Sequence, residues 1–314
     1  MGAQGPLPSQ KPFYGWLLRV ASWVLRTVGV LTALAGFGAT HAPGWTLKGI
    51  LLGASFAGIV ITIAGLELGK YARRHLMSAA ESPGSIAPGT YVLYLRPFSL
   101  DASMDGLDSK FDNTQMSAFQ SGRTHEEQLA RMFRKFGRLV TVGRPGERLP
   151  QGTGARRVYI PQSGWEPIVA ELIANARVVI LGAWPGQGTV WEYVQVLRAG
   201  DPSRFIVLVT DTAHYDQFRE LAMTAASEAL PDLRERHGST FEVPELPDLP
   251  PPAKVKWGAT PSYFRAMMFF DADWAADLEF FRTTNDAAAL TPVLAHVRAG
   301  VTASERSSYR LAGK

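Results

Sequence analysis

The segment "RVVILGAWPGQGTVWEYVQVLRAG", residues 177–200, contains the pattern that decides the fold. Its first part, residues 177–183, is an apolar run rich in β-branched residues, which predicts a buried strand. A glycine-rich turn follows, and residues 189–200 then have the spacing of a helix that ends at glycine. A strand that leads directly into a helix is the unit from which parallel α/β sheets are built.

The same order of elements recurs along the middle of the chain. Apolar, β-branched runs predict further strands, at residues 91–95, 138–143 and 204–210. Helical spacing of apolar residues predicts further helices, at residues 126–137, 165–176 and 215–230. This alternation indicates an α/β fold, with a parallel sheet covered by helices on both faces. We expect the flavodoxin-like strand order 2-1-3-4-5, with residues 264–274 returning as an edge or fifth strand.

Two apolar segments precede this domain, and both predict membrane spans. Residues 49–66, "GILLGASFAGIVITIAGL", carry no charge over 18 residues, nearly the length that crosses a bilayer. A buried soluble helix is the alternative, although such helices rarely stay apolar on every face. Residues 16–38 form the other candidate, in which Arg19 and Arg26 share one face and can reach the headgroups. For this segment, an N-terminal half that lies in the membrane interface is the open alternative.

The basic residues predict how these spans are oriented in the cell membrane. Residues 1–75 hold seven Lys or Arg and one acidic residue, and most of the basic residues flank the outer ends of the spans. By the positive-inside rule, both termini are cytoplasmic. A second span argues against a cleaved signal peptide. Gly49, Gly53 and Ala57 recur every four residues and allow another helix to pack closely, either the first span or a second copy of the chain.

The composition of the remaining residues excludes several classes of function. With 25 basic and 27 acidic residues, they have no basic excess for a nucleic-acid partner. The chain has no cysteine, which excludes disulfides and thiolate chemistry. Its six histidines are scattered without metal-ligand spacing, so we expect neither a metal site nor a bound cofactor.

We expect four parts along the chain. They are a transmembrane hairpin at residues 1–75, a linker at 76–90, the α/β domain at 91–230, and a C-terminal extension at 231–314. Within the extension, residues 244–252 predict a stiff, proline-rich linker, and the tail from Thr302 is expected to be disordered.

Glu192 has two competing interpretations. Thr189 and Glu192 fit a capping box, in which both side chains satisfy exposed N–H groups where a helix begins. Residues 124–127 and 163–166 have the same spelling, so three helices are predicted to begin in this way. Spelling alone favours this structural interpretation.

The position of Glu192 favours a role in a site. In open α/β sheets, ligands bind beyond the carboxyl ends of the strands, where the strand order reverses. Arg96 ends strand one, and the helix that contains Glu192 follows strand three, so we expect the two side chains to face each other across this crevice. A cation, helix N–H donors, a carboxylate and aromatic rings suit a nucleotide. The other candidate ligands there are Phe98, Trp184, Gly188, Thr189 and Trp191.

Several of these residues keep a structural alternative. Arg96 can form a salt bridge at the strand end, and Trp184 and Trp191 can be packing residues. Residues 143–157, "GRPGERLPQGTGARR", match neither a P-loop nor the GxGxxG pattern and predict a mobile surface loop.

Residues 91–230 resemble a bacterial TIR-like domain. The resemblance rests on the opening "YVLYLRPFSLD", on the loop after strand two, and on the Trp-Glu pair after strand three. The motif "GTVWE" is also similar to that of nucleoside 2-deoxyribosyltransferases. Both families break N-glycosidic bonds, so the resemblance implies that Glu192 stabilises the positive charge that develops at C1′.

We therefore expect a membrane-anchored, cytoplasmic TIR-like domain that binds an NAD-like nucleotide. The resemblance implies that it cleaves the N-glycosidic bond through Glu192, while Arg96 holds phosphate and Trp184 or Phe98 stacks on the base. The alternative is a non-enzymatic signalling scaffold that self-associates through residues 144–157. In both hypotheses the expected partners are the lipid bilayer and further copies of the chain.

Overall fold

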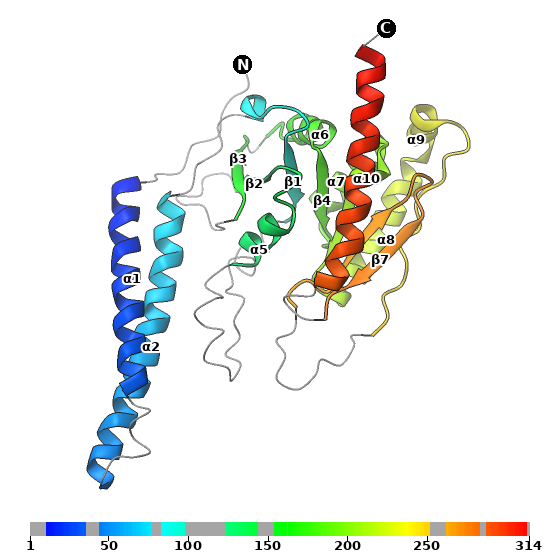
Figure 1. Cartoon of the computed structure of the whole chain (residues 1–314). Helices are drawn as coiled ribbons and strands as arrows, with labels where there is room; N and C mark the ends of the chain where they lie inside the picture. Colours follow the sequence, from blue (N-terminus) through cyan, green and yellow to red (C-terminus); the bar gives the residue numbers. More distant parts are fainter. Residues whose placement is uncertain are drawn as a thin grey trace. The chain divides into compact units, whose positions relative to one another are not determined.

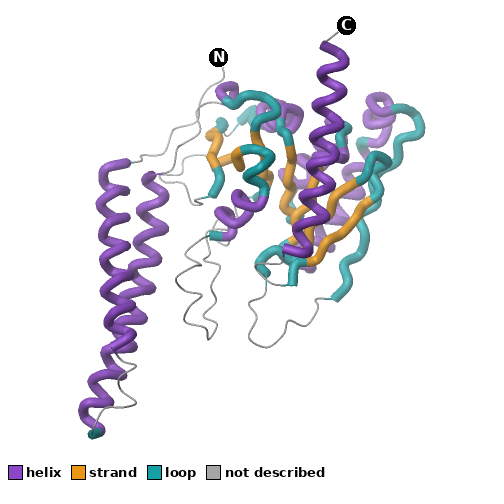
Figure 2. Tube along the Cα trace, viewed as in Figure 1, coloured by secondary structure: helices purple, strands orange, loops and turns teal. Residues whose placement is uncertain are grey.

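The computed structural model describes residues 11–35, 44–76, 83–97, 124–143, 154–161, 163–251, 262–282 and 287–312. These residues form two compact units, a helical hairpin and an α/β domain (Figure 1). Figure 2 shows the hairpin as two helices and the domain as strands of one sheet accompanied by helices.

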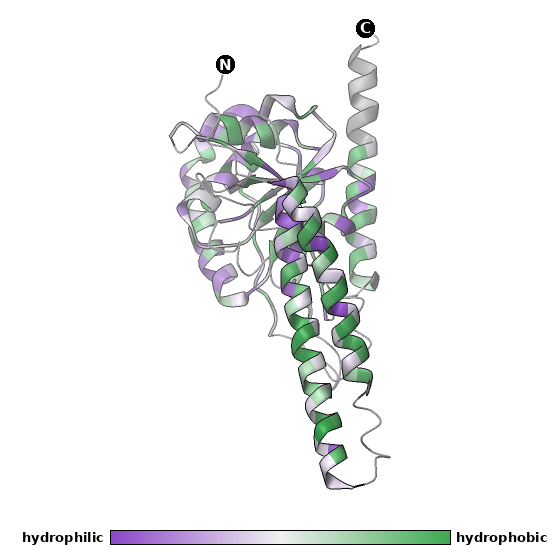
Figure 3. Ribbon diagram, turned by 90° about the vertical axis from the view of Figure 1, so that its left-hand side faces the viewer, coloured by the Kyte–Doolittle hydropathy of each residue, from purple (hydrophilic) through white to green (hydrophobic). Residues whose placement is uncertain are grey.

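The hairpin consists of α1, Pro12–Ala35, and α2, Trp45–Leu76. Both helices are long and apolar enough to cross a membrane, and Figure 3 colours much of their length as hydrophobic. Large apolar side chains such as Leu31, Leu52 and Phe56 are exposed on the hairpin, a surface that suits lipid tails. Each predicted span therefore corresponds to one such helix.

The two helices pack through small residues. A β-carbon at Gly58 would lie 2.3 Å from the backbone nitrogen of Ala33 and 2.5 Å from the carbonyl oxygen of Gly29, so the two backbones meet there. Ser22 donates a 2.7 Å hydrogen bond to the carbonyl oxygen of Gly65 and joins the helices at a second point. Small residues allow this close approach, which supplies the packing that holds helices together in lipid.

The stripe predicted to receive another helix lies elsewhere on α2. A β-carbon added at Gly49 or Gly53 would meet no atom within 4 Å among the described residues. The first span is therefore the wrong partner for this stripe, because α1 packs on the face that carries Gly58 instead.

Replacing Gly58 with leucine is expected to separate α1 from α2, because the new side chain would collide with the backbone of α1. Cysteines introduced at Leu25 and Gly65 report the separation, since the two β-carbons would lie 3.1 Å apart in the native packing, within a few tenths of an ångström of the separation that a disulfide needs. Their disulfide should form readily in the parent chain and several-fold less in the Gly58→Leu variant. Gly53→Leu is the control, and equal crosslinking in the two leucine variants would contradict the packing described.

The α/β domain is built on one seven-stranded sheet in the order β3-β2-β1-β4-β5-β6-β7. Five strands run parallel: β1 (Tyr91–Leu95), β2 (Arg138–Gly143), β3 (Arg156–Tyr159), β4 (Val178–Gly182) and β5 (Phe205–Val209). The remaining two are β6 (Ala266–Phe270), which pairs antiparallel with β5, and β7 (Ala276–Phe280), which pairs antiparallel with β6. The order of the four predicted strands, here β2-β1-β4-β5, is confirmed, and β6 returns beside β5 as expected. Strands β3 and β7 were not predicted, and β3 begins inside the predicted surface loop.

Alternate strand positions supply two apolar cores, one on each face of the sheet. Leu93 and Leu95 of β1 belong to the first core, and Val92 and Tyr94 belong to the second. The helices that contribute to the first core are α6 (Glu166–Asn175), α7 (Gln187–Ala199), α8 (Thr212–Glu228) and α9 (Leu230–His237). Those that contribute to the second are α5 (His125–Met132) and α10 (Ala287–Ala312). Helices thus cover both faces, as predicted.

The C-terminal extension is more ordered than predicted. Leu246 in the proline-rich segment is 2% exposed, and the carbonyl oxygen of Pro247 accepts a 2.7 Å hydrogen bond from the hydroxyl of Tyr215. This segment is therefore packed against α8 and is not a free linker. The tail expected to be disordered continues α10 as far as Ala312.

Candidate functional site

The predicted capping box is present at one helix of the three. The Thr124 hydroxyl accepts a hydrogen bond from the N–H of Glu127 at 3.2 Å, and the Glu127 carboxylate accepts one from the N–H of Thr124 at 3.0 Å. Helix α6 begins after Trp165 without a side-chain cap. Helix α7 begins after Gly186, also without one, so Glu192 lies in its second turn. The capping interpretation of Glu192 is wrong because the helix begins two residues earlier than predicted.

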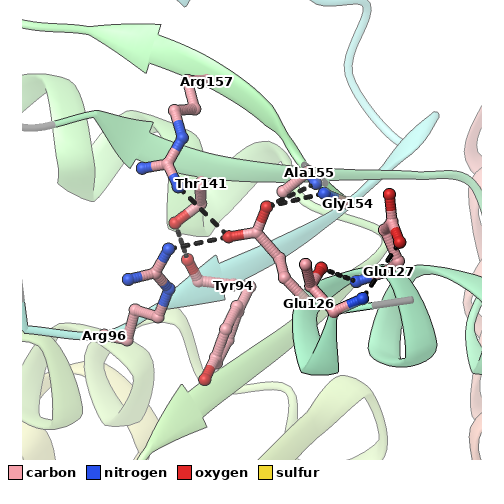
Figure 4. A network of polar contacts seen from close by, with 9 residues as sticks. Tyr94, Arg96, Glu126, Glu127, Thr141, Gly154, Ala155 and Arg157 are labelled. Carbon is pink, nitrogen blue, oxygen red and sulfur yellow. Dashed lines mark hydrogen bonds and ion pairs between the residues drawn. The ribbon is translucent and has the colours of Figure 1, made fainter. Parts of the chain in front are cut away.

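Glu126 lies at the centre of a buried network of polar contacts (Figure 4). Its Oε2 accepts hydrogen bonds from Nη2 of Arg96 at 2.7 Å and from Nη2 of Arg157 at 3.3 Å. Its Oε1 accepts hydrogen bonds from the backbone N–H groups of Gly154 and Ala155 at 2.9 and 2.8 Å. The carboxylate is fully buried, and the Arg96 and Arg157 side chains are 2% and 1% exposed. The network joins β1, α5 and β3.

The charges around Glu126 and the close approach of Gly154 both support this network. Burial by itself would raise the pKa of Glu126, but the charges of Arg157 and Arg96 and the N–H of Ala155 together lower it below its usual value. Glu126 is therefore an anion between two cations. A β-carbon at Gly154 would lie 2.3 Å from the backbone of Glu126, so only glycine lets the chain before β3 approach α5 so closely.

Glu192 has no comparable partner. Its side chain keeps partial exposure to solvent and makes no hydrogen bond or ion pair with another residue in the described part of the chain. Burial raises its pKa to about 8, and no cation offsets that effect. The carboxyl group is therefore mostly protonated at neutral pH.

Arg96 and Glu192 do not meet, contrary to the prediction. Arg96 lies over the ring of Tyr94, with 5.6 Å between the guanidinium carbon and the ring centre, and it pairs with Glu126 of α5. Helix α7, which carries Glu192, packs on the opposite face of the sheet. Arg96 follows β1, and α7 follows the neighbouring strand β4, as predicted, but the prediction did not account for the face of the sheet on which each side chain lies.

The other predicted ligands are dispersed. Trp184 stacks on His214, with ring centres 3.7 Å apart, so one of its faces is already covered. Trp191 packs edge-on against Trp165 at 4.8 Å. Thr189 is buried and Gly188 is exposed. Phe98 and most of the loop at residues 144–157 lie outside the described residues.

Sequence reasoning missed Glu126, Arg157 and His214. A signal for Glu126 was present, because the capping box contains two adjacent glutamates and only one of them can cap the helix.

His214 belongs to the first turn of α8, where Oδ1 of Asp211 accepts a 3.0 Å hydrogen bond from the backbone N–H of His214. That bond is the largest of the effects that lower the pKa of Asp211.

Comparison of the chain with models of protein families gave no match. Comparisons with curated proteins and with solved structures gave none either. Among the described residues, no group of three or more His, Asp or Glu side chains is arranged to hold a metal ion.

Proposed function

We propose that this protein is a membrane-anchored signalling scaffold whose TIR-like α/β domain acts through assembly with further copies of the chain. The observation that carries the proposal is the buried ion pair between Arg96 and Glu126. This arginine was the candidate phosphate ligand, and it is buried in an ion pair on the face opposite to α7.

The burial of Arg96 favours the scaffold over a nucleotide site there. Its guanidinium group is 2% exposed and paired with Glu126, so a phosphate would have to take the place of a buried carboxylate. Arg96 is therefore expected to remain a structural residue.

The scaffold proposal is tested with the full chain reconstituted at high density in lipid vesicles and incubated with NAD. We expect nicotinamide release at the background level, equal in the parent chain and in the Glu192→Gln variant. Counting photobleaching steps of labelled protein in supported bilayers is expected to give more than one copy per spot. Nicotinamide release that depends on Glu192 would contradict the proposal, and so would a single copy per spot at every protein density.

A second candidate, cleavage of an N-glycosidic bond, is favoured by the environment of Glu192. A perturbed, unpaired carboxyl group near the carboxyl end of a sheet is typical of functional sites. In this candidate the carboxylate form stabilises the positive charge at C1′. It needs an ionised Glu192 and does not need Arg96.

The second candidate predicts a specific pH dependence. With a pKa of about 8, Glu192 is ionised in roughly a tenth of the molecules at pH 7 and in roughly nine tenths at pH 9. Nicotinamide release should therefore rise about ninefold between these pH values in the parent chain, and it should be absent from Glu192→Gln. A rate that is flat across this range would exclude Glu192 as the catalytic carboxylate.

A further inference from the structure

The amino ends of β1, β2 and β3 surround a hollow of about 250 Å³, at the end of the sheet away from Glu192. Its lining includes Arg138 and Arg156, and no acidic residue is among the described residues that line it. Thr90 also lines the hollow, but its hydroxyl already donates a 2.6 Å hydrogen bond to the carbonyl oxygen of Ala87. The arginines are therefore the main donors available to a ligand.

Neither arginine is neutralised within the described part of the chain. No carboxylate there forms an ion pair with Arg138 or Arg156, and Nε of Arg156 is buried without a hydrogen-bond partner. A buried N–H group without an acceptor is unfavourable, and an anion in the hollow would remove that penalty. The hollow is several times the volume of a water molecule, which is about 30 Å³, so it has room for a phosphate group.

Further positive charge lies along the adjoining surface. Arg131, Arg134, Lys135 and Arg138 are all exposed, and we call these four residues the basic strip. The turn between α5 and β2 brings the strip to the hollow, because a β-carbon at Gly137 would lie 2.3 Å from the carbonyl oxygen of Thr90. Exposed like charges at this density attract anions over roughly a Debye length.

We propose that the hollow binds the phosphate group of an anionic lipid headgroup, with the basic strip attracting the surrounding negative surface. Guanidinium groups match the geometry of phosphate and bind it through paired N–H donors. The covalent connection favours a lipid source. Seven peptide units join Leu76, the last residue of α2, to Pro83, and they span at most about 25 Å. A domain tethered this closely to a membrane helix meets headgroups at high effective concentration.

The test uses the full chain in lipid nanodiscs and measures amide hydrogen exchange at residues 83–90 and 133–138, beside the hollow. In discs that contain phosphatidylglycerol, exchange is expected to be at least about threefold slower than in phosphatidylcholine discs. Inorganic phosphate added to the neutral discs supplies the same chemistry without lipid and is expected to slow exchange less. Equal slowing by millimolar phosphate would overturn the lipid source, and no slowing in either arm would overturn the site.

Three variants that each remove one positive charge distinguish binding in the hollow from general electrostatic attraction to the anionic membrane surface. Arg138→Gln removes a charge from the hollow, and because Arg138 is exposed the variant is expected to fold and to lose most of the protection. Arg131→Gln removes the same charge from the basic strip alone and should lose less. Arg298→Gln, on the exposed side of α10, should keep all of it. Equal protection in the Arg138 and Arg298 variants would overturn the proposal.

Discussion

Replacing Glu126 with glutamine is expected to lower the free energy of unfolding of the α/β domain by about 3–5 kcal/mol. The substitution keeps the size of the side chain but removes the anion between Arg96 and Arg157, which leaves two buried guanidinium groups side by side. The full chain in nanodiscs can be unfolded with urea, and pulse proteolysis measures the folded fraction at each concentration.

Glu127→Gln is the matched control, since it changes the adjacent glutamate. Glu127 belongs to the capping box, and glutamine keeps an oxygen that can accept from the N–H of Thr124, so this replacement should cost less than about 1 kcal/mol. The dependence of the free energy of unfolding on pH in acid gives a second check of the network. The pKa of Glu126 is lowered from 4.5 in the folded protein, so its stabilising contribution is present above pH 4.5 and is lost as the pH falls through the folded value. The parent chain should lose this contribution in acid, whereas Glu126→Gln has none to lose. Equal effects of the two glutamine variants at neutral pH would contradict the network.

Replacing Glu192 with glutamine is expected to have the opposite effect and to stabilise the domain in alkaline solution. Burial raises the pKa of Glu192 from 4.5 to about 8, so the stability that the protonated form provides is complete below pH 4.5 and is lost as the pH rises through 8. Glutamine stays neutral and avoids that loss. We expect a gain of up to about 4 kcal/mol at pH 9, reduced by the partial exposure of the side chain.

The same urea experiment, repeated from pH 5 to pH 9, measures this effect. The two proteins should differ least at pH 5 and diverge as the pH rises. Glu220→Gln, at an exposed position on α8, is the control and should change stability little at any pH. A constant difference between parent and Glu192→Gln across the range would show that Glu192 does not titrate near 8.

Local sequence patterns were sufficient to predict the four central parallel strands of the sheet. The apolar, β-branched runs that became β1, β2, β4 and β5 are buried on both faces, which gives them a recognisable composition. Strand β3 is different because two of its four residues are arginines, Arg156 and Arg157. Such a composition predicts a surface loop, and the partner that makes burial of Arg157 tolerable, Glu126, lies 31 residues away.

The prediction of the candidate site was wrong about the direction in which the Arg96 side chain points. Alternation along β1 puts Val92 and Tyr94 on one face and Leu93 and Leu95 on the other, so Arg96 continues on the face of Tyr94. Applying that rule one residue beyond the strand would have turned Arg96 toward α5. The distance between Arg96 and Glu126 could not be predicted in this way, because it depends on how the chain before α5 returns to the sheet.

The hydrogen bond from Ser22 to Gly65 bears on whether α1 and α2 behave as one unit. Thr27 and Thr32 of α1 donate to carbonyl oxygens of their own helix, whereas Ser22 donates to α2 and so ties the two helices together. The backbones also touch at Gly29 and Gly58 with no room for lipid between them. The two apolar helices are therefore joined by a side-chain hydrogen bond as well as by backbone contact, so we expect them to behave as one paired unit rather than as two independent segments.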